Sequence, residues 1–147
     1  MKNANEAIDA FCASYQGVLG TFTADAENDE GFAIATAPVK NRHVSESRIL
    51  ITTEDPEDMY AEKVEFVRQE SKPLPMGKPK DLELKFGFDE EYATINNFKF
   101  MGIKGGILYL AGRMGGTVVC LQMFATKMNL SDDDLNVLMD AVKAAIQ

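Results

Sequence analysis

The chain contains little cysteine, one histidine and no tryptophan. Cys12 and Cys120 are the two cysteines and His43 is the one histidine among 147 residues. So few thiol and imidazole groups exclude a disulfide framework and a zinc site. Both cysteines occupy apolar positions, and we interpret them as small buried hydrophobic side chains in a reducing compartment.

Long apolar runs are also missing. The longest stretches, such as residues 117–125, fall well short of the roughly 20 residues that a membrane span needs. The first six residues contain one cation and no apolar core, so no signal peptide is expected. The sequence therefore predicts a cytoplasmic protein without a membrane span.

Basic residues are outnumbered by acidic ones. Lys and Arg total 15, Asp and Glu total 23, and the net charge is −8. This balance argues against sequence-independent nucleic-acid binding and against an anionic membrane surface, although a local basic patch is compatible with an acidic total. The hydrophobic fraction of 46% excludes general disorder, and the length predicts a single domain over residues 1–147.

The N-terminal residues predict a helix. Asn3 and Glu6 have the spacing of a capping box, and Gly17 is expected to end the helix. Four side chains recur at the spacing of one helical face: Ile8, Phe11, Cys12 and Tyr15.

A β-hairpin is expected next. Residues 18–23 and 31–37 have strand-like composition, and the acidic segment 25–30 joins them. Residues 38–71 are ambiguous, because a β-branched stretch over 49–53 indicates a strand whereas Asp55 followed by Pro56 is an acceptable helix start. We leave that segment open.

After a proline-rich loop over residues 72–80, the pattern is strongly β. Residues 82–88 alternate with a period of 2. Three further strands are expected over 95–103, 107–111 and 117–126, with turns at the glycine pairs 105–106 and 115–116. The sequence therefore predicts an antiparallel meander.

The C-terminal residues predict a second terminal helix. Ser131 is a typical N-cap, the three aspartates 132–134 suit the positive end of the helix dipole, and Leu130 can contact Leu135 as a hydrophobic staple. Its apolar face comprises Leu135, Leu138, Met139, Val142 and Ile146. We therefore expect an α+β fold in which the N- and C-terminal helices pack on one face of a central antiparallel sheet.

Catalytic and metal-binding patterns are not found. His43 has no partner that the sequence identifies, and the glycines of 112–116 separate two strands instead of opening a helix that could hold phosphate. Asp25, Glu27 and Asp29 have calcium-loop spacing, but Glu30 stands where that loop needs glycine. We predict no enzyme activity, no catalytic residue, no metal site and no cofactor.

The basic residues of the strand-rich half are the most suggestive feature. Lys99, Lys104, Arg113 and Lys127 are accompanied by Phe98, Phe100, Met101, Met114 and Met123. Alternation along a strand puts roughly half of these side chains outside the core. Outward apolar side chains rimmed by cations are common on protein-binding faces, although core residues with scattered charges would give the same pattern.

Two ends of the chain resemble a profilin. The matching parts are residues 107–124 with the following loop and helix, and at the other end the first helix with residues 17–23 and 31–35. The resemblance implies a monomeric protein that binds actin monomers and regulates actin polymerisation. It places the actin-binding face on Lys104, Arg113, Met114, Met123, Lys127 and Asn129. Arg113→Glu or Lys127→Glu is then expected to weaken actin binding.

The same resemblance implies two weaker partners. Proline-rich peptides would bind near Phe11 and Tyr15, and phosphoinositides would bind to basic surface. Polyproline recognition needs an aromatic-lined groove, and this chain has no tryptophan and no aromatic residue in its C-terminal helix. We therefore expect weak or absent polyproline binding, and the acidic total weakens the phosphoinositide expectation.

Two other interpretations stay open. One is a small acidic chaperone of secreted proteins, a class built as helix, strands, helix, strands, helix and usually dimeric; an unbroken run of four strands over 82–126 fits it poorly. The other is an α+β domain that binds a small molecule in a pocket lined by some of the eight methionines.

Overall fold

The computed structural model describes residues 2–41, 44–71, 77–82 and 86–147. The helices are α1 (Ala4–Ser14), α2 (Pro56–Glu70) and α3 (Asp132–Ile146). The strands are β1 (Thr23–Ala24), β2 (Phe32–Asn41), β3 (Val44–Thr52), β4 (Lys80–Asp81), β5 (Glu90–Phe100), β6 (Ile103–Met114) and β7 (Thr117–Thr126).

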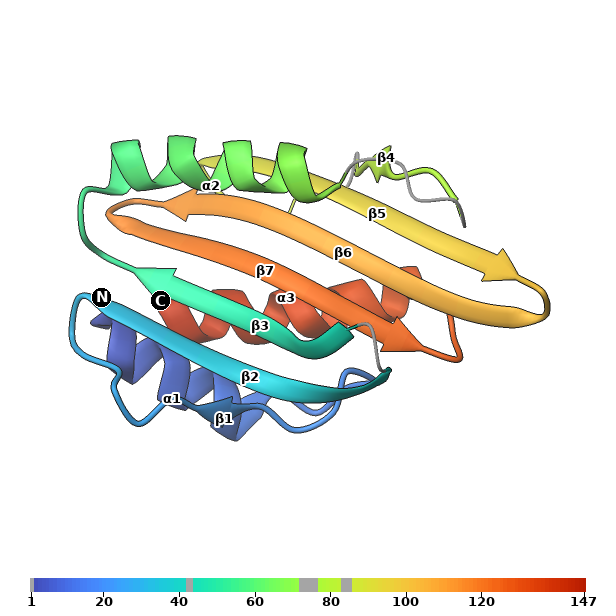
Figure 1. Cartoon of the computed structure of the whole chain (residues 1–147). Coiled ribbons are helices and arrows are strands. Elements are labelled where there is room, and N and C mark those ends of the chain that lie inside the picture. The colour runs from blue at the N-terminus through green and yellow to red at the C-terminus, as the bar shows by residue number, and fades with distance from the viewer. Residues whose placement is uncertain (1, 42–43, 72–76, 83–85) are drawn as a thin grey trace.

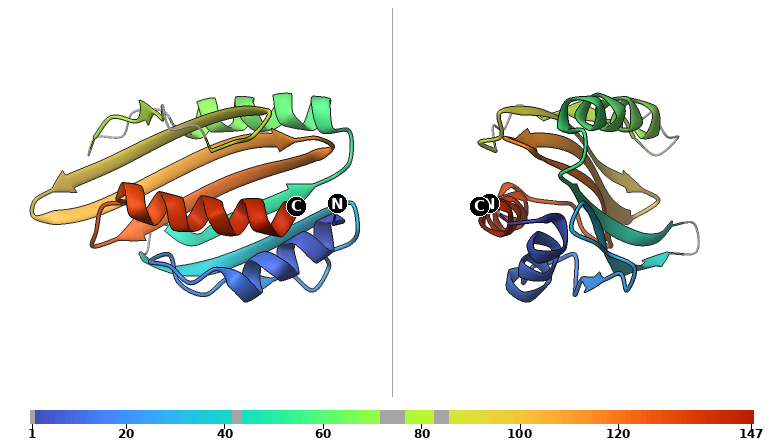
Figure 2. Two further views of the ribbon diagram at one scale, coloured as in Figure 1. Left: turned by 180° about the vertical axis from the view of Figure 1, so that it is seen from behind. Right: turned by 90° about the vertical axis from the view of Figure 1, so that its left-hand side faces the viewer.

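The described strands form one antiparallel sheet in the order β1-β2-β3-β7-β6-β5-β4. Helices α1 and α3 lie side by side on one face, and α2 lies on the other (Figures 1 and 2). The predicted α+β fold, with both terminal helices on one face of a central sheet, is therefore confirmed.

Both terminal helices begin at capping boxes, which confirms the box predicted at Asn3 and the N-cap predicted at Ser131. Asn3 Oδ1 accepts a hydrogen bond from Glu6 N at 2.8 Å, and Ser131 Oγ accepts one from Asp134 N at 3.1 Å. Because each cap satisfies orphan amides of the first turn, the helix starts are well defined. All five residues predicted for the apolar face of α3 are buried.

The main core lies between the sheet and the pair α1 and α3. On this face the buried residues of β2 are all alanines, namely Ala33, Ala35 and Ala37, and each is fully buried. Alanine at these positions lets α1 approach the strand closely. The centre of the sheet contributes larger side chains, including Leu108, Leu110, Leu121 and Met123.

A smaller core lies under α2. Val67 is fully buried against Tyr109 and Ala111 of β6, and Phe66 packs edge-on against Tyr109 with 6.3 Å between ring centroids. Arg68 lies over the ring of Tyr92 at 5.2 Å. Helix α2 therefore covers β5, β6 and β7 and leaves the β2 and β3 side of this face uncovered (Figure 1).

The side chain of Asn97 in β5 forms hydrogen bonds with the loop before α3. Its Nδ2 donates to Leu130 O at 2.8 Å, and its Oδ1 accepts from Leu130 N at 2.9 Å. These two hydrogen bonds satisfy the backbone N–H and the backbone C=O of Leu130, neither of which is paired within a helix or strand. Leu130 itself is buried.

We expect Asn97→Ala to destabilise the protein by about 2 kcal/mol, because two partly buried backbone groups of Leu130 would lose their partner. Urea unfolding should show this as a lower midpoint with an unchanged slope. Asn136→Ala, on the exposed side of α3, is the matched control and should shift the midpoint little. Equal stability of the two variants would contradict the role of Asn97.

The expected strand over 18–23 is wrong except at its last residue. The chain there runs as a loop that bends at Gly20, where φ is +93°, and that is held by the buried side chains of Leu19 and Phe22. Only Thr23 and Ala24 pair with β2. Apolar spacing alone did not distinguish a loop anchored by two buried side chains from a strand.

The expected turn at Gly105–Gly106 is also wrong, because both glycines lie inside β6. A side chain at position 105 would meet the ring of Phe98, and one at 106 would meet Asn97 and Leu130. These glycines make room for neighbouring side chains. The turn lies instead at Met101–Gly102, within the strand expected over 95–103, whereas the turn at Gly115–Gly116 is confirmed.

Two other segments were undecided or misassigned. The open segment 38–71 continues β2, forms β3 and then forms α2, which begins at Pro56 as its composition allowed. The strand expected over 82–88 is not found in its described part, because residues 86–88 form no strand and Phe86 packs into the core as part of a bend. Residues 83–85 lie outside the described residues.

Candidate protein-binding surface

Strand β2 carries its larger apolar side chains on the face away from α1 and α3. Phe32 and Ile34 are on this side, each half-buried, whereas the alanines between them face the helices. Register continues this side of the sheet onto Leu50 and Cys120, which are buried, and onto Phe124, which is partly exposed. We call these five residues, Phe32, Ile34, Leu50, Cys120 and Phe124, the open face.

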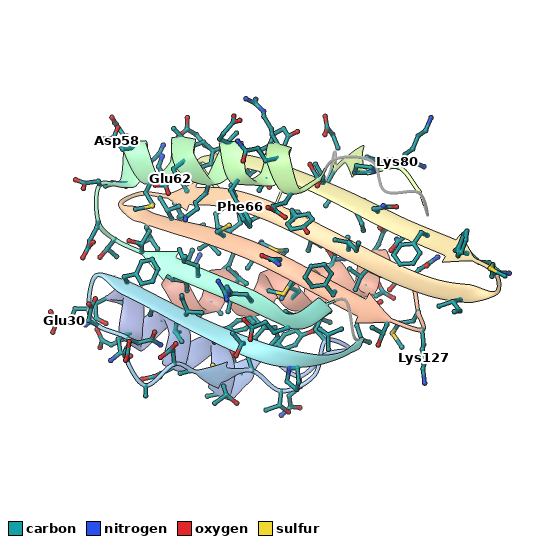
Figure 3. All side chains as sticks on the ribbon, in the orientation of Figure 1. Glu30, Asp58, Glu62, Phe66, Lys80 and Lys127 are labelled. Atoms are coloured by element: carbon teal, nitrogen blue, oxygen red, sulfur yellow. The ribbon has the colours of Figure 1, made fainter. Side chains whose placement is uncertain are left out.

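No described helix lies over the β2 and β3 part of the open face (Figure 3). Phe124 marks its border, since it packs edge-on against Tyr109 at 6.1 Å, next to α2. An apolar sheet surface bounded by a helix on one side can receive an extended or helical apolar segment of another chain.

Polar groups at the margin of the open face can orient such a segment. Arg48 is exposed and its Nη2 lies 2.8 Å from Glu46 Oε1. Gln122 lies opposite both Arg48 and Tyr109. Burial raises the pKa of the Cys120 thiol to about 11, and nearby Lys63 and Arg48 lower it only in part. The thiol is therefore neutral at physiological pH and is a packing group, not a nucleophile.

The acidic segment 25–30 closes one edge of this surface. Asn28 Oδ1 accepts from Ile34 N at 2.8 Å and Asn28 Nδ2 donates to Ile34 O at 2.9 Å, so this side chain takes the place of a strand partner for β2. Asp29 Oδ1 accepts from the amides of Gly31 and Phe32. The turn therefore protects the edge of β2, a structural task that composition did not reveal.

The structure separates the residues predicted for an actin-binding face. Lys104, Lys127 and Asn129 are exposed at one end of the sheet. Arg113 and Met114 are at the opposite end of β6, nine to ten residues or about 30 Å away along the strand. Met123 is fully buried in the main core. The six residues therefore do not form one contiguous patch.

Arg113 is held by local ion pairs. Its Nε lies 2.8 Å from Glu90 Oε2 and its Nη1 lies 3.7 Å from Asp89 Oδ2. The hydrogen bond that Arg113 donates to the Glu90 carboxylate is the main cause that raises the pKa of Arg113. This arginine therefore has a structural role, because it ties the start of β5 to the end of β6.

Phe11 and Tyr15, the residues named for polyproline binding, are buried. Their rings stack at 5.4 Å between centroids, and Phe22 meets both edge-on. The Tyr15 hydroxyl accepts a hydrogen bond from Leu19 N at 3.3 Å. An open hollow next to Tyr15 is lined by residues 16–18 and 20–21 and includes no charged side chain. These aromatic rings are therefore part of the hydrophobic core.

The two cysteines differ in exposure. Cys120 is buried as expected, whereas Cys12 is partly exposed, so that part of the interpretation is wrong. His43 lies outside the described residues. Within the described ranges, no group of three or more His, Cys, Asp or Glu residues could hold a metal ion. None of the three described helices combines the length and apolar character that crossing a membrane requires.

No family model matches the chain, and no curated protein matches it. The chain is similar to the crystal structure of PA94 from Pseudomonas aeruginosa, a protein of unknown function, at 18% identity, with 87% of this chain and 95% of that chain covered. The TM-score is 0.29, which is too low to carry an argument.

Proposed function

We propose that this protein is a non-catalytic cytoplasmic module of the small acidic chaperone class, and that it binds an apolar segment of a partner protein on the open face. The observation that carries the proposal is the arrangement of β2, which turns Phe32 and Ile34 away from the helices and alanines toward them. A strand that only built the core would have the opposite arrangement.

The order of elements supports the same proposal. The chain runs helix, strands, helix, strands, helix, which is the order expected for that class. The objection from four consecutive strands is reduced, since β4 has only two residues and three long strands follow it. Two free cysteines suit a reducing compartment.

Actin-monomer binding is the second candidate. What favours it is that Lys104, Lys127 and Asn129 lie exposed at one end of the sheet. The separation of Arg113 from this group weighs against it.

The first test is substitution on the open face. Once a bound partner has been identified by co-purification and its binding segment mapped, Ile34→Glu should weaken binding about tenfold or more, because a carboxylate would replace a buried apolar contact. Val137→Glu, at an exposed position of α3, is the matched control and should bind normally. Titration calorimetry measures both affinities.

A titration of actin monomers distinguishes the two candidates. Saturable actin binding that Lys127→Glu weakens and Ile34→Glu leaves unchanged would contradict the chaperone proposal. Sedimentation adds an independent observation, since a dimer is typical of the chaperone class and a monomer is expected for a profilin.

A further inference from the structure

The β5–β6 hairpin presents an unusual cluster of exposed apolar side chains. Met101 is 86% exposed, Ile103 is 65% exposed and Phe100 is 46% exposed. Met128, in the loop after β7 at the same end, is 41% exposed. The hairpin extends beyond the other strands at that end of the molecule (Figures 1 and 2). We call these four residues the apolar tip.

The geometry of the β5–β6 turn does not account for a methionine at its apex. Met101 and Gly102 form the two-residue turn between the opposed residues Phe100 and Ile103, and their φ angles are +50° and +81°. Positive φ at both positions strongly favours Asn-Gly or Asp-Gly, whereas methionine is strained there. A strained methionine that is 86% exposed points to an external contact of its side chain.

A row of lysines lies beside the apolar tip. Lys99 is directly opposite Lys104, and Lys127 follows β7 at the level of Lys104, because Thr126 is opposite Gly105. Like charges directly opposite each other destabilise a sheet. Among the described residues, no carboxylate forms an ion pair with any of the three, including the exposed Asp132 and Asp133 that follow in the chain.

Several acidic residues lie at the other end of the sheet. Helix α2 begins there with Glu57 and Asp58, next to Asp89 and Glu90 of the β5 start. Figure 3 shows Asp58 and Glu30 at one end and Lys80 and Lys127 toward the other. Asp132, Asp133 and Asp134 in the first turn of α3 also lie at the lysine-bearing end, so it is the three lysines beside the hairpin, and not a net positive charge, that an anionic surface can approach.

We propose that the apolar tip inserts into the interface of an anionic lipid bilayer while Lys99, Lys104 and Lys127 contact its headgroups. The proposal goes beyond partner binding on the open face. A projecting apex fits a fluid bilayer better than a preformed protein groove, and apolar side chains next to unpaired lysines match the boundary between acyl chains and charged headgroups. Nucleic acid would use the lysines but would leave Ile103 and Met101 exposed.

Flotation with vesicles tests the proposal. The probes are vesicles of phosphatidylcholine alone and vesicles that also contain phosphatidylserine. We expect the protein to float with the anionic vesicles, to bind them at least tenfold more tightly than neutral ones, and to dissociate as salt is raised. Replacing each of Lys99 and Lys104 by Gln should weaken binding about fivefold per lysine. Lys2→Gln, remote from the tip, is the control.

Met101→Asn separates folding from binding. Asparagine suits the turn, so this variant should unfold at the same or a higher temperature than the wild type, while it binds anionic vesicles about tenfold more weakly. Val137→Asn is the matched control, because it also removes an exposed apolar side chain but lies on α3. Failure of the wild type to bind either vesicle would overturn the proposal, and so would equal binding by Met101→Asn and the wild type.

Two further outcomes also overturn it. If sedimentation shows self-association that Met101→Asn abolishes while vesicles stay unbound, the tip is a contact between copies. If an acidic protein partner binds the tip and vesicles do not, the tip is a protein-binding site. Neither result touches the proposal for the open face, which Ile34→Glu tests separately.

Discussion

Replacing Phe11 by Ala is expected to lower the free energy of unfolding by about 4 kcal/mol. Phe11 is fully buried, stacks on Tyr15 and meets Phe22 edge-on. Truncation would remove the apolar contacts of the ring and leave a cavity between α1 and the sheet. Chemical denaturation with far-ultraviolet circular dichroism measures the change.

The control for this variant is Val18→Ala, since Val18 is 45% exposed in the loop that follows α1. It should change stability by less than about 0.5 kcal/mol. The comparison also addresses polyproline binding. If Phe11 were a ligand-binding residue on the surface, Phe11→Ala would reduce peptide binding and leave stability near that of the control.

The sequence predicted the terminal helices well, because the signals that define them are local. Asn3 with Glu6 and Ser131 with Asp134 are capping pairs three residues apart, and each helix buries one continuous apolar stripe. Such features need no knowledge of distant contacts. The α+β fold followed from them, since two apolar stripes require a sheet to cover.

The strand boundaries were harder to predict because they depend on contacts between distant residues. Gly105 and Gly106 lie inside β6, where Phe98 and Leu130 occupy the space that a side chain at these positions would take. The true turn contains Met101, which local preference would not place at positive φ. In both places tertiary packing or an external contact overrides the local signal.

The candidate surfaces were partly visible in the sequence. The cluster of Lys99, Lys104 and Lys127 with Phe100 and Met101 was identified from composition as a protein-binding pattern. Its division into an apolar apex and a lysine row required the register of β5 with β6. The open face was not predicted from the sequence. In β2 alanines alternate with larger residues, and this alternation does not show which of the two sets faces the terminal helices.

Raising the pH above about 9 is expected to destabilise the fold through Cys120. Burial raises the pKa of this thiol from 9.0 to about 11. The folded state therefore holds the proton more tightly than the unfolded state, so the stabilisation is complete below the unfolded pKa and is lost as pH rises through the folded pKa. The difference corresponds to about 3 kcal/mol lost between about pH 9 and pH 11.

Tyr109 should extend the loss to higher pH, since burial, together with Glu70, raises its pKa from 10.0 to about 12. Unfolding free energies measured in urea across this range would test both groups. Cys120→Ala should flatten the dependence in the lower part of the range, and Tyr109→Phe should flatten it in the upper part. Cys12→Ala is the matched control, because Cys12 is partly exposed and should leave most of the slope intact. An unchanged slope in Cys120→Ala would mean that the thiol has the same pKa in the folded and unfolded states. The thiol would then be solvated in the folded protein, which would contradict its burial between the neighbouring strands of the open face.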